Sequence, residues 1–536
     1  MARALAAAIA VSLLAVSGAG GAGVQTPKRG GTVVFGNLAE PPCLNVILAA
    51  CNSEATRYIA ELILQPAFDV GTEYTFRPRL VSRVSFTRKS PFTLTYHIRP
   101  AARWSDGVQI TARDFLFTYR AWVGSSAGLS ESERQDFRRV RRVSALDAKT
   151  VRVVLRSRFS GWRNLFANVL PSHALKGQDL TKLWTDGIDN PKTGAAIGSG
   201  PFLVGRWERG RQLTLVRNPR YWGAHTAYLD RIVVRFRVES ENPVDLFRNG
   251  ELDVAYGIFA DAVFALRRAG VNVLAEPSTG YQAFFFRTDP PGHPALRGKQ
   301  GKLVRRALAY GIDRAALVRE VPGEINPNLR PLQSLLFLVQ SPYYRPHWSR
   351  YRYRPALARR MLEQAGCRQG TDSIYSCDGE RLSLRFLTRA GNPARARILA
   401  LVQAQLRQSG VEVVPTFATP SAFEEILSSG GFDVVLFGFF STPNPTGNSI
   451  FGCGGSGNYT GYCQRLVTSD LDQADRILDA RQQARVMNRA DAQMARDMPA
   501  LPVFQIPLAT AVRDTVKNFA QALNPLTNSE NWWLER

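Results

Sequence analysis

The residue types that carry out hydrolysis or bind metals are scattered through this chain of 536 residues. No H-E-x-x-H motif and no close histidine pair that would suit zinc occurs, and a G-x-S-x-G nucleophile elbow and a P-loop are also absent. The five histidines are His97, His173, His225, His293 and His347. The sequence therefore shows no recognised catalytic or metal-binding set, and it indicates no cofactor.

One glycine-rich run, Gly452 to Gly457, fits the pattern G-x-G-x-x-G. A dinucleotide-binding fingerprint must follow a strand directly and open a helix. Here the residues from Asn458 to Cys463 have the composition of further loop. We interpret the run as a flexible loop closed by a disulfide, rather than as a nucleotide site.

A second segment, Gly438 to Pro445, combines aromatic and polar residues as ligand pockets do. It follows an apolar run that predicts a buried strand, and ligand sites in open α/β sheets lie beyond the carboxyl ends of strands. The candidate pocket residues are Phe439, Phe440, Ser441 and Asn444. The alternative is a loop whose two aromatic rings belong to the core, and the sequence leaves both possibilities open.

The elements that would position this segment alternate between helix and strand patterns. Ser53 and Thr111 are placed to cap helices, and Asp114 stands where a capping box needs an acidic residue. Helices are expected at 53–64, 355–365, 395–408 and 470–498, and strands at 32–35, 92–98, 151–155, 202–204, 213–216, 232–236, 411–414 and 434–437. This order predicts a mixed α/β protein of several units with crossover connections.

Six cysteines form three local pairs along the sequence. Six cysteines allow 15 pairings, and we predict that neighbours pair, since no C-x-x-C spacing suggests zinc or redox chemistry. The predicted disulfides are Cys43–Cys51, Cys367–Cys377 and Cys453–Cys463. Disulfides fit an oxidising compartment outside the cytoplasm.

Residues 1–23 are typical of a signal peptide, with Arg3 before a short apolar stretch and small residues at its end. The stretch is too short for a permanent anchor, and it contains no cysteine for lipid attachment. We therefore expect an exported protein, periplasmic or on the outer face of the cell membrane.

Composition and charge set further limits. Apolar residues make up 45% and charged residues 21% of the chain, which is ordinary for a globular protein. The net charge of +24 comes mainly from arginine, but no nucleic-acid-binding motif accompanies it. We interpret the charge as a compositional bias over a large surface, and we expect a monomer that binds no nucleic acid.

The run from Ile197 to Gly223 resembles the family 5 extracellular solute-binding proteins, the receptors of peptide, oligopeptide and nickel ABC importers. It reads I-G-S-G-P-F and then R-N-P-R-Y-W-G, with Trp207, Gly210 and Leu215 between. Similar matches occur in chain order at Gly30–Asn45, at W-S-D-G from Trp104, at Arg305–Arg314 and at Tyr353–Gly366.

The resemblance implies a two-lobed, hinged α/β fold of the larger peptide-binding type, with an extra domain inserted in lobe one. Lobe one would combine residues 25–66, 190–279 and 508–536, the insert would be 67–189, and lobe two would be 280–507. The hinge strands would lie near Ser278 to Tyr281 and Pro507. Asn45, in the loop after the first strand, and Tyr281, at the hinge, join the candidate ligand-binding residues.

The implied function is capture of a peptide or similar small solute between closing lobes, followed by delivery to ABC permease subunits. Peptide-binding members often place an aspartate after the strand equivalent to 434–437, where it pairs with the peptide's amino terminus. Gly438 to Pro445 contains no acidic residue, so a solute with a neutral end is one possibility. A secreted carboxylate-based hydrolase acting on glycans or peptides remains the alternative, because paired carboxylates can lie anywhere among 44 acidic residues.

Overall fold

The computed structural model describes residues 26–71, 74–87, 89–124, 131–236, 243–258, 260–443, 445 and 447–535. The predicted signal peptide and Asn444 lie outside the described residues. Within the described ranges no helix is long and apolar enough to cross a bilayer. They also contain no group of three or more histidine, cysteine or acidic side chains that could hold a metal ion.

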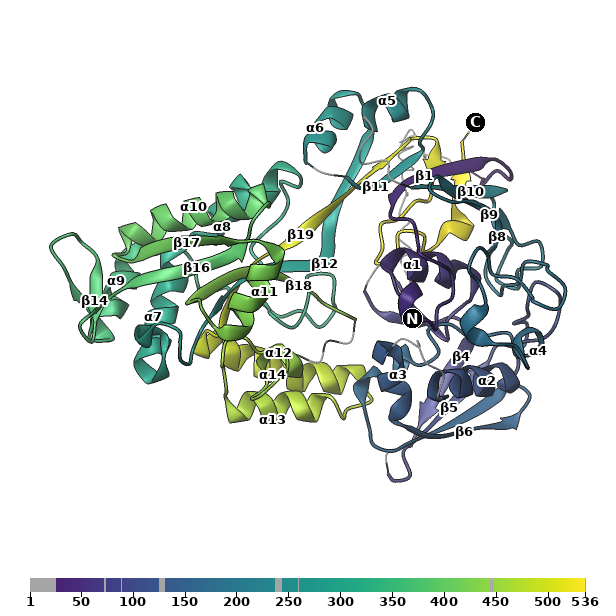
Figure 1. Ribbon diagram of the computed structural model, residues 1–536, viewed down its shortest axis with the longest axis horizontal. Coiled ribbons are helices and arrows are strands. Elements are labelled where there is room, and N and C mark those ends of the chain that lie inside the picture. Colours follow the sequence, from purple (N-terminus) through teal and green to yellow (C-terminus); the bar gives the residue numbers. More distant parts are fainter. Residues whose placement is uncertain are drawn as a thin grey trace, which may run out of the picture.

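One ten-stranded mixed sheet runs through both halves of the molecule (Figure 1). Its strands, in spatial order, are β17 (Glu412–Ala418), β16 (Ser383–Arg389), β18 (Val434–Phe440), β12 (Asn272–Phe286), β19 (Ala500–Val512), β11 (Val254–Ile258), β1 (Thr32–Leu38), β10 (Arg231–Phe236), β9 (Gln212–Arg217) and β8 (Phe202–Glu208). The central pair, β12 and β19, has 15 and 13 residues and is much longer than its neighbours.

Two large apolar cores lie on either side of this central pair. We call the bodies around them lobe one and lobe two. The core of lobe one gathers residues from Val33 to Val254 and from the chain's last segment, including Trp532, together with Leu478. The core of lobe two gathers residues from Tyr281 to Phe504, together with Tyr74. The chain is therefore a two-lobed α/β protein, as expected.

A separate four-stranded antiparallel sheet belongs to the lobe-one side. Its order is β4 (Val81–Phe86), β5 (Thr93–Ile98), β7 (Thr150–Leu155) and β6 (Val140–Asp147). This sheet falls within the predicted insert, residues 67–189, but its inward side chains, such as Tyr96 and Val153, share one core with lobe one. The insert and its boundaries stay predictions.

Helices cover the sheets, and two pairs of short strands and one small three-stranded sheet lie at the periphery. The helices are α1 (Glu54–Ile63), α2 (Ala112–Val123), α3 (Glu131–Arg138), α4 (Ser172–Leu175), α5 (Pro243–Arg248), α6 (Ala260–Arg268), α7 (Gly298–Gly311), α8 (Arg314–Glu320), α9 (Pro355–Gln364), α10 (Pro393–Gln408), α11 (Pro420–Ser429), α12 (Asn448–Phe451), α13 (Arg465–Ala474) and α14 (Ala480–Asp497). The small strands are β2 (Phe68–Val70) with β3 (Phe76–Pro78), β13 (Arg368–Gln369) with β14 (Tyr375–Cys377) and β15 (Glu380–Arg381), and β20 (Val516–Lys517) with β21 (Trp533–Leu534).

The predicted caps form as expected. The Ser53 hydroxyl accepts a hydrogen bond from the Thr56 amide at the start of α1. Thr111 and Asp114 build a capping box at the start of α2. These contacts satisfy amide groups that have no partner inside the helix.

Several predicted boundaries were wrong, and two of them have a clear structural reason. The expected helix 470–498 is two helices, α13 and α14, with a break at 475–479. Leu478 in that break is buried in the core of lobe one, so tertiary packing interrupts a pattern that looks continuous. The strand predicted at 434–437 also extends to Phe440, because Gly438, Phe439 and Phe440 pair with β12.

The run from Ile197 to Gly223 is a structural junction at the end of α1. The amides of Ser199 and Gly200 both donate to the Ile63 carbonyl, at 2.8 and 2.9 Å. The Trp222 indole donates a hydrogen bond to the Ser199 carbonyl at 2.8 Å. The side-chain amide of Asn218 donates to the Gly200 carbonyl, also at 2.8 Å. The signature that carries the family resemblance therefore shapes lobe one.

Candidate functional site

A cavity of about 470 Å³ lies beside the central strands and is lined from both lobes. Its size is within the usual range of small-ligand sites. Its lining comes from the start of α1, the β2–β3 turn, β11, β12, the loop that contains Gln340, β18, β19 and the chain segment 521–523. The lining residues are Glu54, Tyr58, Gly71, Tyr74, Tyr256, Glu276, Pro277, Ser278, Thr279, Gln340, Phe440, Ile506, Pro507, Leu508, Gln521, Ala522 and Leu523.

The central strands are irregular where they border the cavity. Pro277 pairs with Pro507, and regular pairing resumes only at Tyr281 with Gln505. Proline has no amide hydrogen to donate to a ladder, so hydrogen bonding between the strands is sparse here. Two side chains compensate in part, because the amides of Gln340 and Gln505 donate to the carbonyls of Pro277 and Ser278.

Phe440 is the predicted site residue that lines the cavity. Its side chain is 78% exposed, the largest value among the exposed large apolar side chains of the described residues. Its backbone pairs with Gly280 of β12, and the phenyl ring lies over that glycine, where a Cβ atom would come within 3.1 Å of it. An exposed ring held on a strand at the mouth of a cavity is well placed to pack on a bound solute.

Phe439 points to the opposite face, because side chains alternate along a strand. Its ring packs at 4.5 Å from the ring of Phe437 and 5.2 Å from that of Phe285. It belongs to the aromatic cluster of lobe two and is not in the cavity lining. Of the two aromatic residues expected to line a pocket, the structure places Phe440 in the lining of this cavity and Phe439 in the core packing of lobe two.

Ser441 and Tyr281 support lining residues without lining the cavity themselves. The Ser441 amide donates to the Thr279 carbonyl at 2.9 Å, and its carbonyl accepts a hydrogen bond from the Tyr74 hydroxyl. Tyr281 is 3% exposed, and its hydroxyl donates to the Leu335 carbonyl at 3.2 Å. Tyr281 is thus a core residue of lobe two.

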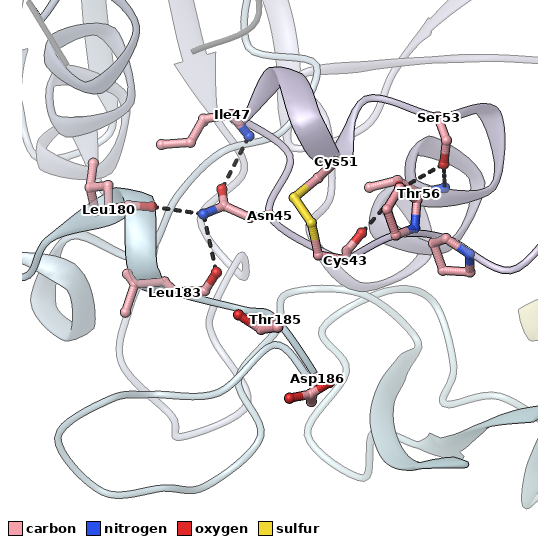
Figure 2. Close-up of a disulfide and its surroundings, with 12 residues drawn as sticks. Cys43, Asn45, Ile47, Cys51, Ser53, Thr56, Leu180, Leu183, Thr185 and Asp186 are labelled. Carbon is pink, nitrogen blue, oxygen red and sulfur yellow. Dashed lines mark hydrogen bonds between the residues drawn. A yellow bond between two sulfur atoms is a disulfide. The ribbon is translucent and has the colours of Figure 1, made fainter. Parts of the chain in front are cut away.

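Asn45 lies away from the cavity, beside the disulfide Cys43–Cys51 (Figure 2). Its amide nitrogen donates to the carbonyls of Leu180 and Leu183, at 2.7 and 3.1 Å, and its oxygen accepts from the Ile47 amide (Figure 2). The side chain is 2% exposed, and both its donor hydrogens are used. Asn45 therefore fastens the disulfide loop to residues 180–183, and its expected contact with a solute is not supported.

The structure contains the three expected disulfides, Cys43–Cys51, Cys367–Cys377 and Cys453–Cys463. The last closes the loop that holds the G-x-G-x-x-G match, and within it the Asn458 amide donates to the carbonyls of Gly452 and Tyr462. This run is a loop closed by a disulfide, in agreement with our interpretation, and its flexibility stays a prediction.

The sequence analysis did not predict the tyrosines that line the cavity, Tyr58, Tyr74 and Tyr256. Tyr58 lies one turn after Glu54 on α1, and its hydroxyl donates to the Glu54 carboxylate. Burial raises the pKa of Tyr58, and the neighbouring Tyr256 and Glu54 raise it further. Burial also raises the pKa of Tyr74, and that of Tyr256 to about 12. All three are neutral hydroxyls at physiological pH.

Two signals could have pointed to these residues. The spacing of Glu54 and Tyr58 on the predicted helix places them on one face, four residues apart. Glu276 lies two residues before Ser278, where the expected hinge segment begins. Neither signal shows which separated segments meet in space.

The lobes also touch away from the central strands. In Figure 1 the helices α13 and α14 of lobe two extend towards α3 on the lobe-one side. Leu478, in the break between α13 and α14, packs into the core of lobe one. The Ser160 amide donates to the Asp475 carbonyl at 2.7 Å, and the Trp162 indole to the Leu478 carbonyl at 3.3 Å.

Comparison with known proteins identifies the family. Residues 75–461 match the model of the bacterial extracellular solute-binding proteins, family 5. The chain belongs to this family. It is 26% identical to the oligopeptide-binding protein OppA of Mycobacterium bovis over 511 residues, which cover 92% of this chain and 83% of OppA.

Solved structures agree on the fold of this family 5 protein. The periplasmic EDTA-binding protein EppA superposes with a TM-score of 0.77 at 24% identity, covering 96% of this chain and 98% of EppA. The oligopeptide-binding protein AppA of Bacillus subtilis, in complex with a nonapeptide, superposes with a TM-score of 0.65 at 21% identity, covering 95% of this chain and all of AppA. Membership of a solute-binding family favours a receptor over the secreted hydrolase.

Proposed function

We propose that this protein is the extracytoplasmic solute receptor of an ABC importer, which captures a peptide or a similar small solute in the cavity between its lobes. The observation that carries the proposal is that cavity, since residues of both lobes line it beside the irregular central strands. The relatives add support, because they include oligopeptide-binding proteins that match over most of their length.

The mechanism follows from the position of the cavity. Pro277 and Pro507 leave the central strands weakly paired, which makes this stretch the natural place for a hinge. A solute that contacts both lobes binds the closed arrangement more tightly than the open one, and so shifts the population towards closure. The ABC permease, as membrane partner, then distinguishes a loaded receptor from an empty one by its shape.

Native mass spectrometry of the purified full-length protein tests the proposal. We expect a small solute to be retained under gentle conditions and released on denaturation. Small-angle X-ray scattering of the stripped protein should then show a smaller radius of gyration when that solute is added back. A protein that retains no solute and shows no change in radius with peptide mixtures would contradict the proposal, and turnover of a peptide or glycan would favour the hydrolase.

A further inference from the structure

The charged side chains that line the interlobe cavity are all acidic. Glu54, on the first turn of α1, and Glu276, on β12, contribute two carboxylates from separate segments. The described lining includes no lysine, arginine or histidine. The chain as a whole has 68 lysine and arginine residues and 44 acidic residues, so its net charge is positive. The charged side chains of the cavity are negative, which is the opposite sign.

Both carboxylates are available to a ligand. Glu54 and Glu276 are exposed, and in the part of the chain that the structure describes neither takes part in an ion pair. The Tyr58 hydroxyl donates to the Glu54 carboxylate and so orients it. The two oxygens of a carboxylate together accept several hydrogen bonds. The hydrogen bond from Tyr58 therefore leaves Glu54 able to accept others.

Aromatic side chains line the same cavity as the two carboxylates. Phe440 lies at the cavity with most of its ring exposed, and Tyr256 stands edge-on to Tyr58 with ring centroids 6.5 Å apart. Tyr74 adds a third phenol, held by its hydrogen bond to Ser441. Ring faces attract cations, and carboxylates form charge-assisted hydrogen bonds with ammonium and guanidinium groups.

We propose that the solute carries a cationic group, an ammonium or a guanidinium, which binds between Glu54 and Glu276 against the aromatic rings of the cavity. This inference rests on the proposed function and narrows its substrate class. Glu54 and Glu276 supply the negative charge that the segment Gly438 to Pro445 lacks, and they do so from lobe one and from the central strand.

The cation can come from the amino terminus of a peptide or from a basic side chain. Three matched probes separate the two sources: Ala-Ala-Ala-amide with a free amino terminus, its N-acetylated form, and N-acetyl-Ala-Lys-Ala-amide. Isothermal titration calorimetry with the stripped full-length protein measures each affinity. We expect at least one cationic probe to bind about tenfold or more tightly than the neutral acetylated peptide, and the stronger of the two identifies the source.

Substitution then tests the two carboxylates. Glu54→Gln and Glu276→Gln keep the shape of the side chains and remove the charge, and we expect each to reduce the preference for the cationic probe about tenfold. Glu425→Gln removes the same charge from the exposed face of α11, outside the cavity, and is expected to leave the preference unchanged. Retention of the full preference in the double variant Glu54→Gln/Glu276→Gln would overturn the inference.

The failure of this inference can be told apart from failure of the proposed function. If the solute recovered from the native protein is neutral or acidic, the receptor function stands and the cationic class is wrong. If neither cationic probe binds better than the acetylated peptide, the inference is likewise overturned. The receptor function itself is contradicted by a protein that retains no solute and shows no change in radius with peptide mixtures, or by one that turns over a peptide or glycan.

Discussion

The indole nitrogen of Trp162 donates a hydrogen bond to the carbonyl oxygen of Leu478, across the boundary between the two lobes. Both residues are buried, at 2% and 5% exposure, and both pack in the core of lobe one. The lobes are thus joined at the central strands and also at the break between α13 and α14. We call α13, α14 and this break, residues 465–497, the helical arm. Closure of the cavity must either keep this second contact or exchange it for another.

Leu478→Ala is expected to loosen the arm. A buried Leu→Ala change costs about 2–5 kcal/mol, and here the loss falls on a contact between lobes. Hydrogen exchange measured by mass spectrometry should rise in residues 159–163 and 475–479. Leu466→Ala, on the exposed face of α13 at 68% exposure, serves as the control and should leave the exchange of both segments unchanged. Unaltered exchange in Leu478→Ala would show that the arm does not depend on this side chain.

Phe440→Ala is expected to weaken solute binding about tenfold to a hundredfold, as the burial of one phenyl ring contributes about 1.5–3 kcal/mol. Its exposure of 78% means that the free protein gains little from the ring, so thermal stability should hardly change. Phe417→Ala, 49% exposed on β17 and outside the cavity, is the matched control. Equal affinities for the recovered solute in the two variants would remove Phe440 from the site.

Gly200→Ala is expected to destabilise lobe one severely. A Cβ atom at this position would lie 1.8 Å from the carbonyl oxygen of Leu62, which is backbone and cannot rotate away. We expect a loss of at least about 3 kcal/mol in the free energy of unfolding, the upper end of ordinary overpacking. Urea denaturation measures it, with Gly457→Ala as control, since there the nearest neighbour of a Cβ atom is 3.5 Å away. A loss no greater than that of the control would disprove the close packing of this junction.

The pH dependence of stability should carry a contribution from Asp491 on α14. Burial raises the pKa of Asp491 from 3.8 to about 7, although hydrogen bonds from Ser334 and Leu335 oppose the rise. Between about pH 4 and pH 7 the folded protein therefore holds a proton that the unfolded chain has released. Stability from this group is complete at low pH and falls as the pH rises through this window.

Asp491→Asn removes this titration while it keeps an oxygen to accept from the Leu335 amide. The melting temperature of the variant should fall less between pH 5 and pH 8 than that of the wild type. Burial also raises the pKa of Asp475, to about 6, so a smaller slope of the same sign should remain. Parallel melting profiles for wild type and variant would contradict a raised pKa at Asp491.

Much of the fold could be predicted from the sequence. Helices and strands with a clear period, such as α1 and β7, and caps such as Ser53 and Thr111 depend on local interactions that a single segment contains. The break between α13 and α14 contains no proline or glycine that would predict it from the sequence. It depends on the burial of Leu478 against a segment more than 300 residues away, so no local pattern could show it.

The site was predicted only in part for a related reason. Phe440 was found because aromatic residues at the end of a buried strand are a local signal. Glu54, Tyr256 and Glu276 come from three segments that meet only in the folded chain. Asn45 has the residue type of a ligand contact, but the hydrogen bonds that occupy it come from residues 180–183, which the sequence places far away.

The path of the chain through the ten-stranded sheet also sets the order in which the two lobes can be completed. β11 of lobe one pairs with the end of β19, at Ala509 to Val512, and Trp532 fills the core beside Phe35. Lobe two is built almost entirely from residues between Tyr281 and Phe504. A chain that leaves the membrane amino terminus first can therefore complete lobe two before lobe one, whose last pieces arrive only with the final residues of the protein. Lobe one, which begins first along the chain, is therefore completed last.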